Sequence, residues 1–106
     1  MPKPIILAVD DDAQVLNAIE RDLRQHYRND YRIVVASSGA DALGLVRRFK
    51  QRNDPLALFL VDQRMPAMEG TAFLATAREF YPQARKVLLT AYADTQAAIA
   101  SINQIG

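Results

Sequence analysis

The hydrophobic residues of this chain occur in four short runs, separated by stretches in which apolar positions recur every three or four residues. The runs cover 5–9, 31–36, 56–61 and 86–89. Ile5 to Val9 is continuously apolar, without the alternation of a half-exposed strand, which is typical of a strand covered on both faces by helices. The second run is rich in β-branched residues, which favour strands. The pattern predicts four strands.

The stretches after each run carry the periodicity of amphipathic helices. Three of these helices have a residue suited to cap the amino end, namely Asp12, Ser38 and Asp94, and Asp41 lies in capping-box-like spacing from Ser38. The third helix is expected over 71–80. The predicted apolar faces consist of Val15, Leu16, Ile19 and Leu23; Ala42, Leu45, Val46 and Phe49; Phe73, Leu74, Ala77 and Phe80; and Ala98, Ile99, Ile102 and Ile105.

Strands and helices therefore alternate along the whole chain, with short loops between them. Alternation of this kind predicts an α/β fold in which a parallel sheet is doubly wound by right-handed crossovers. With 106 residues, the chain has the length of a single domain.

The composition of the chain excludes several classes of function. Thirteen basic and twelve acidic residues leave a net charge of +1, which gives no support to direct nucleic-acid binding. The absence of cysteine excludes disulfides, thiolate metal sites and thiol catalysis. No stretch has the apolar length of a signal peptide or a membrane span, so the expected compartment is the cytoplasm, with no membrane partner.

Polar residues stand where three of the predicted strands end: Asp10 and Asp11, Asp62, and Thr90. If these strands are neighbours, the side chains meet at one edge of the sheet, where α/β proteins bind their ligands. Clustered carboxylates repel one another, and Mg²⁺, which prefers hard oxygen ligands, would compensate. An aspartate can also act as a nucleophile and form an aspartyl-phosphate.

These residues carry a family resemblance. Val9-Asp10-Asp11, the segment Asp62-x-x-Met65-Pro66-x-Met68-x-Gly70, and Thr90-Ala91 resemble, in order, the motifs of the receiver domain of two-component response regulators. The resemblance implies a flavodoxin-like fold with strand order 2-1-3-4-5 and a bacterial signalling function. The domain would not be an enzyme acting on other molecules.

The resemblance also implies a role for each motif residue. Asp62 would be the phosphoacceptor and Thr90 would hydrogen-bond the phosphoryl group and act as the switch. Asp11 and Asp62 would bind Mg²⁺ directly, Arg64 through its backbone carbonyl, and Asp10 through water. The implied partners are a sensor histidine kinase or phosphotransfer protein and an output domain that the receiver switches.

Two departures from the family pattern stand out. Ala67 replaces the usual glycine between Pro66 and Met68, a change expected to be mild. The sequence also ends at Gly106, before the fifth strand with its lysine and switch aromatic, and Lys86 is at the wrong end of the fourth strand to replace that lysine. Residues 1–106 are thus expected to be an incomplete receiver, preceding its output domain, whose fourth-strand edge could support a homodimer.

Other interpretations remain for the same residues. Asp10 and Asp11 could cap a helix or interact with its dipole, and Thr90 could be a satisfied hydroxyl at a strand end. A Mg²⁺-dependent phosphohydrolase with an aspartate nucleophile is a second hypothesis, although Asp62-x-Arg64 lacks the second acid of the common Asp-x-Asp loop. A third is a receiver-like module that signals without phosphate, from which loss of an acidic residue or the threonine would be expected.

Overall fold

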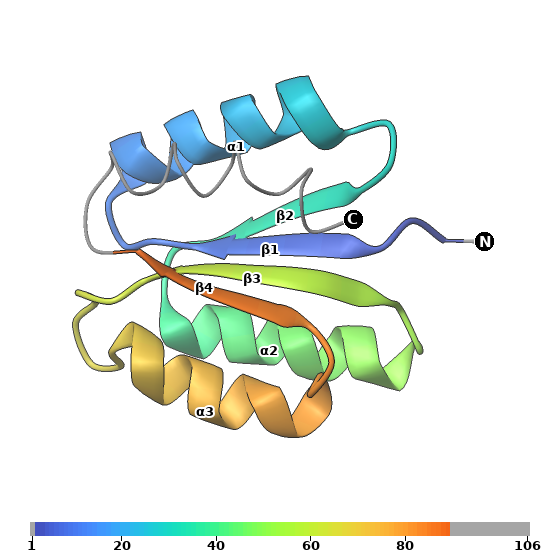
Figure 1. The fold of residues 1–106 in the computed structure, drawn as a ribbon. Helices are drawn as coiled ribbons and strands as arrows, with labels where there is room; N and C mark the ends of the chain where they lie inside the picture. The colour runs from blue at the N-terminus through green and yellow to red at the C-terminus, as the bar shows by residue number, and fades with distance from the viewer. Residues whose placement is uncertain (1, 90–106) are drawn as a thin grey trace.

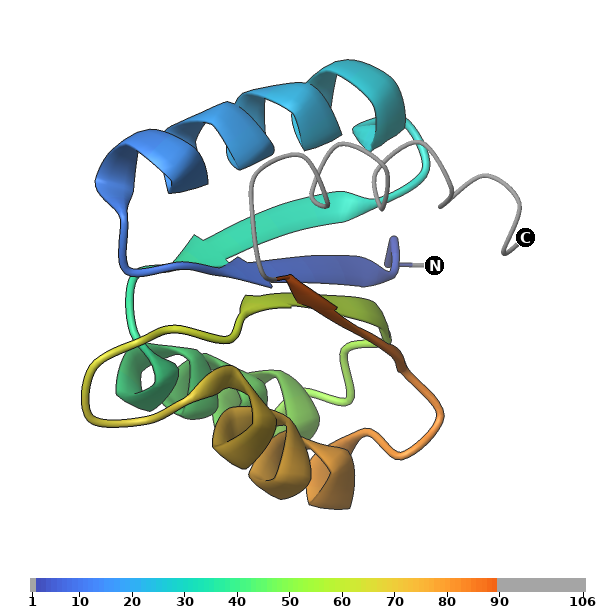
Figure 2. The same cartoon turned by 60° about the vertical axis from the view of Figure 1, so that its left-hand side comes forward.

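A parallel sheet lies at the centre of the computed structural model, which describes residues 2–89 (Figure 1). The chain order is β1 (Ile5–Val9), α1 (Ala13–Tyr27), β2 (Arg32–Ala36), α2 (Gly39–Gln51), β3 (Leu56–Asp62), α3 (Gly70–Phe80) and β4 (Arg85–Leu89). Helix α1 covers one face of the sheet, and α2 and α3 cover the other (Figures 1 and 2).

The strand order is β2-β1-β3-β4, and every neighbouring pair is parallel. This confirms the doubly wound, flavodoxin-like α/β fold that the alternating pattern predicts. The fifth strand of the expected order is not among the described residues. The predicted strand-end residue Thr90 and the helix capped by Asp94 also lie outside them.

The register brings the ends of the two central strands together. Val9 of β1 pairs with Val61 of β3, so Asp10 and Asp62 are the residues that follow at equivalent positions of adjacent strands. The parallel register thus places both carboxylates at the carboxyl edge of the sheet.

Two hydrophobic clusters, one on each face of the sheet, explain why β1 shows no alternation. Ile5, Leu7 and Val9 pack on the side of α2 and α3, while Ile6 and Ala8 pack on the side of α1. All five residues of β1 are buried. Both faces of the strand are therefore interior, as its continuous apolar sequence predicts.

The predicted caps of the first two helices, Asp12 and Ser38, are confirmed. The Asp12 carboxylate accepts hydrogen bonds from the backbone N–H groups of Gln14 and Val15, and the Ser38 hydroxyl accepts one from the N–H of Asp41. These bonds satisfy backbone donors that have no partner within the helix.

The helical faces are slightly rotated relative to the prediction. Val15 and Leu45 are only half-buried, whereas Tyr27 and Leu43, which the periodicity did not include, are buried. The exact direction of a face depends on the neighbours against which the helix packs. Among the described residues, no helix combines the length and the apolar character needed to cross a bilayer.

Candidate functional site

Three carboxylates meet at the carboxyl edge of the sheet, as the strand-end pattern predicts. Asp10, Asp11 and Asp62 each offer one oxygen, and these three oxygens all lie within 4.8 Å of one another. Asp10 is buried, Asp62 is half-buried and Asp11 is exposed. The cluster is therefore closed by the sheet on one side and open to solvent on the other.

Asp10 is the buried member of the cluster, with 5% of its surface exposed. The backbone N–H of Asp12 donates a 2.9 Å hydrogen bond to Asp10 Oδ1. The pKa of Asp10 is raised to about 6, mainly by burial and to a smaller extent by the charges of Asp62, Asp11 and Asp12, while this hydrogen bond acts in the opposite direction. Ionised Asp10 is thus in an unfavourable environment, which a bound cation would improve.

Asp62 is the last residue of β3, so the strand holds its backbone in place. Burial is the largest cause of the raised pKa of Asp62, and the charge of Asp11 adds to it. The backbone N–H groups of Arg64 and Gln63 and the charge of Arg64 act in the opposite direction. The carboxylate of Asp62 is thus affected both by hydrogen-bond donors, which lower its pKa, and by a neighbouring carboxylate, which raises it.

Gln63 organises the loop after Asp62, a role that no sequence pattern indicates. Its side-chain oxygen accepts a 3.0 Å hydrogen bond from the N–H of Thr71, and its backbone oxygen accepts one of 3.1 Å from the N–H of Gly70. Its own N–H donates to the carbonyl oxygen of Leu89, at 3.0 Å. Gln63 thereby connects the acceptor strand to the start of α3 and to the end of β4.

Two small residues set the shape of this loop. A Cβ atom on Gly70 would lie 2.5 Å from the backbone oxygen of Asp62, so only glycine permits this close approach. Ala67 has a φ of 68°, in the left-handed region that favours glycine. Replacement of the usual glycine by Ala67 is therefore not the mild change expected, because the Cβ atom makes this backbone conformation unfavourable.

The other predicted site residues are only partly described. The side chain of Arg64 is exposed, and binding of a metal by its carbonyl stays a prediction. Thr90 lies outside the described residues. Lys86 lies near the start of β4, where its Nζ donates to the carbonyl oxygens of Ala84 at 2.6 Å and Pro82 at 3.4 Å. It is at the amino end of the sheet, far from the carboxylates, as expected.

Comparison with known proteins identifies the family. A family model described as the response regulator receiver domain matches residues 6–106. The chain belongs to this family. It is therefore a receiver domain of the two-component type, a signalling domain with the flavodoxin-like fold.

Individual relatives agree with this membership. The hydrogenase transcriptional regulatory protein HoxA of Cupriavidus necator is 32% identical over 101 residues, which are 95% of this chain and 19% of HoxA. The chain thus spans about a fifth of the length of this curated relative.

Solved structures show the same fold. A protein described as an adenylate cyclase from Rhodopirellula baltica is 33% identical, with a TM-score of 0.69 over 96% of this chain and 70% of that chain. A response regulator receiver domain protein from Clostridium thermocellum has a TM-score of 0.67 at 24% identity, covering 95% of this chain and 75% of that chain.

The three carboxylates also fit a metal ion of the kind that receiver domains typically bind. Mg²⁺ prefers hard oxygen ligands and often takes only one or two protein carboxylates, with water and phosphate oxygens completing its coordination. Asp10, Asp11 and Asp62 supply such oxygens within a cluster of the right size. Their mutual repulsion gives a physical reason for cation binding at this position.

Proposed function

We propose that this receiver accepts a phosphoryl group on Asp62 in a Mg²⁺-dependent reaction. The donor is a phosphorylated histidine of a sensor kinase or of a phosphotransfer protein. The observation that carries the proposal is the cluster of Asp10, Asp11 and Asp62 at the carboxyl edge of the sheet. A cluster of this kind destabilises an empty pocket and favours a site that binds a metal together with a phosphoryl group.

In the proposed reaction, a carboxylate oxygen of Asp62 attacks the phosphorus atom of the donor. An O–P bond forms as the P–N bond to the imidazole breaks, and the departing imidazole nitrogen keeps the electron pair and takes a proton. The backbone hydrogen bond from Arg64 lowers the pKa of Asp62 and so favours the ionised, nucleophilic carboxylate. The chain contributes mainly positioning and electrostatics, as in other phosphoryl transfers.

We assign Mg²⁺ to the carboxylates of Asp11 and Asp62 and to the backbone carbonyl of Arg64, with Asp10 acting through water. When bound, the ion neutralises charge on the phosphoryl oxygens and on the crowded carboxylates. Asp10 holds its position through its bond from the N–H of Asp12.

The consequence of phosphorylation is signalling rather than turnover of other substrates. Thr90 is proposed to hydrogen-bond the phosphoryl group and to report its presence to an output domain. The relative named a transcriptional regulatory protein is much longer than this chain, which supports an output domain in the whole protein. We place the process in the cytoplasm, without direct contact between the receiver and nucleic acid.

Intact-mass measurement after incubation with a small phosphodonor and Mg²⁺ tests the proposal. The wild-type protein is expected to gain one phosphoryl group, and Asp62→Asn none. Asp54→Asn is a matched control, because Asp54 lies at the other end of β3, beside Arg32. Equal uptake by the wild type and Asp62→Asn would reject Asp62 as the acceptor.

A further inference from the structure

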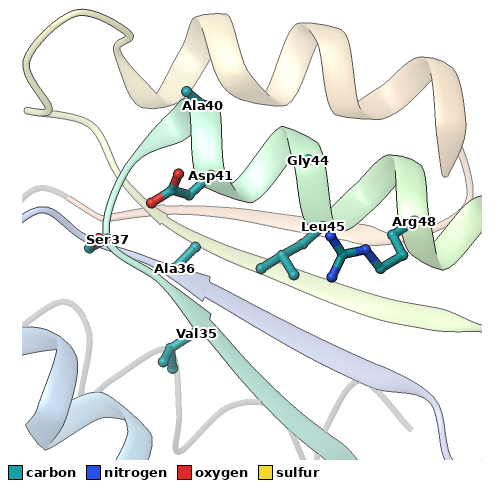
Figure 3. A pocket seen from close by; sticks show the side chains of 8 residues that line it. All are labelled: Val35, Ala36, Ser37, Ala40, Asp41, Gly44, Leu45 and Arg48. Carbon is teal, nitrogen blue, oxygen red and sulfur yellow. The ribbon is translucent and has the colours of Figure 1, made fainter.

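A cleft of about 490 Å³ lies between the edge of β2 and helix α2, and its lining includes none of Asp10, Asp11 and Asp62 (Figure 3). Its walls consist of Val35 and Ala36 from the strand, Ser37 directly after it, and Ala40, Asp41, Gly44, Leu45 and Arg48 from the helix. Strand β2 is terminal in the sheet of the described residues. The cleft is therefore open along a strand edge.

The backbone of this edge has groups available for pairing. The N–H of Arg32 bonds to the oxygen of Pro4, and the oxygen of Ala36 accepts from Asp10, so both residues face β1. Because alternate residues of a parallel strand bond to opposite sides, Ile33 and Val35 face outward. Arg24 donates to the oxygen of Ile33 at 3.3 Å, which leaves Val35 as the outward-facing residue at the cleft.

Gly44 lies in the middle of α2 and has no structural reason to be glycine. A Cβ atom there would contact nothing within 4 Å, and the backbone is not in the left-handed region. Glycine in an exposed helix interior is unfavourable relative to alanine. Because Gly44 has no side chain, it leaves a depression on the surface of α2 next to Leu45 in the cleft. A second helix could approach α2 closely at this position.

The charges on either side of this point are complementary under a two-fold axis. Asp41, Gly44, Leu45 and Arg48 are spaced at i, i+3, i+4 and i+7, which places them on one stripe of the helix. Figure 3 shows the Asp41 side chain towards the start of α2 and Arg48 towards its end, with Leu45 between them. In an antiparallel pair of these helices centred between Gly44 and Leu45, each Asp41 meets Arg48 of the other copy. Each Leu45 then fills the space beside the other Gly44.

We propose that this face is a homodimer interface, in which two copies associate through α2 and the β2 edge around a two-fold axis. The centre of the contact is apolar and its rim is charged, the usual anatomy of an interface. Val35 of each copy would pair antiparallel with Val35 of the other and extend the sheet. Strands ~4.8 Å apart in such a sheet bring helices packed over the edge to about the 8–10 Å at which helices pack.

The partner is a second copy rather than an unrelated chain because the stripe is complementary to itself. A symmetric contact requires that residue i meets j while j meets i. The proposed contacts satisfy this requirement. Asp41 meets Arg48, a residue of opposite charge, and the small Gly44 meets the larger Leu45. Both contacts are made by α2 and include none of the carboxylates at the proposed phosphorylation site. We therefore expect the interface to form without phosphorylation.

Charge reversal provides the first test, with sedimentation equilibrium of the whole protein as the measurement. Asp41→Arg and Arg48→Asp should each weaken self-association by about tenfold, since each replaces two attractive pairs by repulsive ones. An equimolar mixture of the two variants should recover dimers, because both cross-pairs are then attractive. A mixture that stays as weak as the single variants would refute the pairing.

Gly44→Gln separates binding from folding. Gln is a better helix former than Gly and meets open space in the monomer, so the melting temperature should not fall. The bulkier side chain should nevertheless abolish the dimer. Self-association unchanged in this variant would contradict the proposal.

Cross-linking locates the interface directly, because the chain contains no cysteine. Gly44→Cys should form an intermolecular disulfide under mild oxidation, and Ala75→Cys, exposed on α3, should not. Dimers that cross-link only at position 75, or a wild-type protein that stays monomeric at all concentrations, would assign the cleft to a different partner and overturn the inference.

Discussion

Charged residues have opposite environments at the two ends of the sheet. At the carboxyl end, Asp10, Asp11 and Asp62 lie within 4.8 Å of one another, and within the described part of the chain none of them forms a salt bridge. At the amino end, Arg32 lies 3.8 Å from Asp54 and above the ring of Phe49.

Other charges near the amino end are also paired with groups of the fold. Lys3 donates to the backbone oxygen of Arg28 at 3.0 Å, and Lys86 to that of Ala84 at 2.6 Å. These contacts stabilise chain reversals. The difference teaches that charged groups with a partner within the chain stabilise the fold, whereas carboxylates that repel one another and have no salt-bridge partner mark a place where an ion or ligand is expected.

The largest expected effect is loss of the metal site. Asp11→Ala removes an exposed carboxylate proposed to bind Mg²⁺ directly, and loss of an indirect contact alone typically lowers metal affinity by ~10–100-fold. We expect a drop of about a hundredfold or more, measured by amide chemical-shift titration with Mg²⁺. Asp54→Ala, at the amino end, should bind as the wild type does. Equal Mg²⁺ affinities for the wild type and Asp11→Ala would show that the metal does not bind at this cluster.

The second prediction concerns the stability of the same end. The pKa of Asp10 is raised by burial to about 6, so folding favours the protonated form. The stabilising contribution of protonated Asp10 is complete below about pH 3.8 and is lost as the pH rises through about 6. Asp10→Asn keeps an oxygen for the Asp12 N–H but cannot ionise.

In the absence of Mg²⁺, Asp10→Asn should raise the free energy of unfolding at pH 7 by about 1–3 kcal/mol. The gain should shrink towards zero near pH 4, as shown by urea unfolding at a series of pH values. A gain independent of pH would mean that the variant acts through packing rather than through charge.

A smaller effect is expected in the loop that follows Asp62. Ala67→Gly removes the Cβ atom that makes the φ of 68° unfavourable. This gain should exceed the entropic cost of the added freedom of glycine in the unfolded chain, so we expect the free energy of unfolding to rise by about 0.5–1 kcal/mol. Ala72→Gly, at an exposed helical position of α3, should instead destabilise by about 1 kcal/mol. Thermal unfolding distinguishes them, and the same sign for both would argue against strain at Ala67.

The smallest effect belongs to the amino end. Asp54→Asn breaks an ion pair whose Arg32 side chain is about half exposed, so we expect a loss of about 0.5 kcal/mol that disappears at high salt. A loss of several kcal/mol would show that the amino end depends on its charges far more than the geometry indicates.

Much of the fold follows from the order of residues alone. The continuous apolar run of Ile5 to Val9 could only be accommodated between two layers, and the caps Asp12 and Ser38 fix where α1 and α2 begin. Local hydrogen bonding and burial on both faces act over a few residues, so their signals are readable in sequence. The acidic strand ends are readable for the same reason, since each directly follows its apolar run.

The tertiary structure determines which of the acidic strand ends lie next to each other. The register that sets Val9 opposite Val61 brings Asp10 and Asp62 together, and no local pattern specifies a pairing between segments about fifty residues apart. The part played by Gln63 depends likewise on the distant Leu89 and on the turn into α3. The left-handed backbone of Ala67 arises because the loop must return from β3 to α3. Sequence thus determined which residues carry the chemistry, and long-range packing determined their distances, their burial and therefore their charge states.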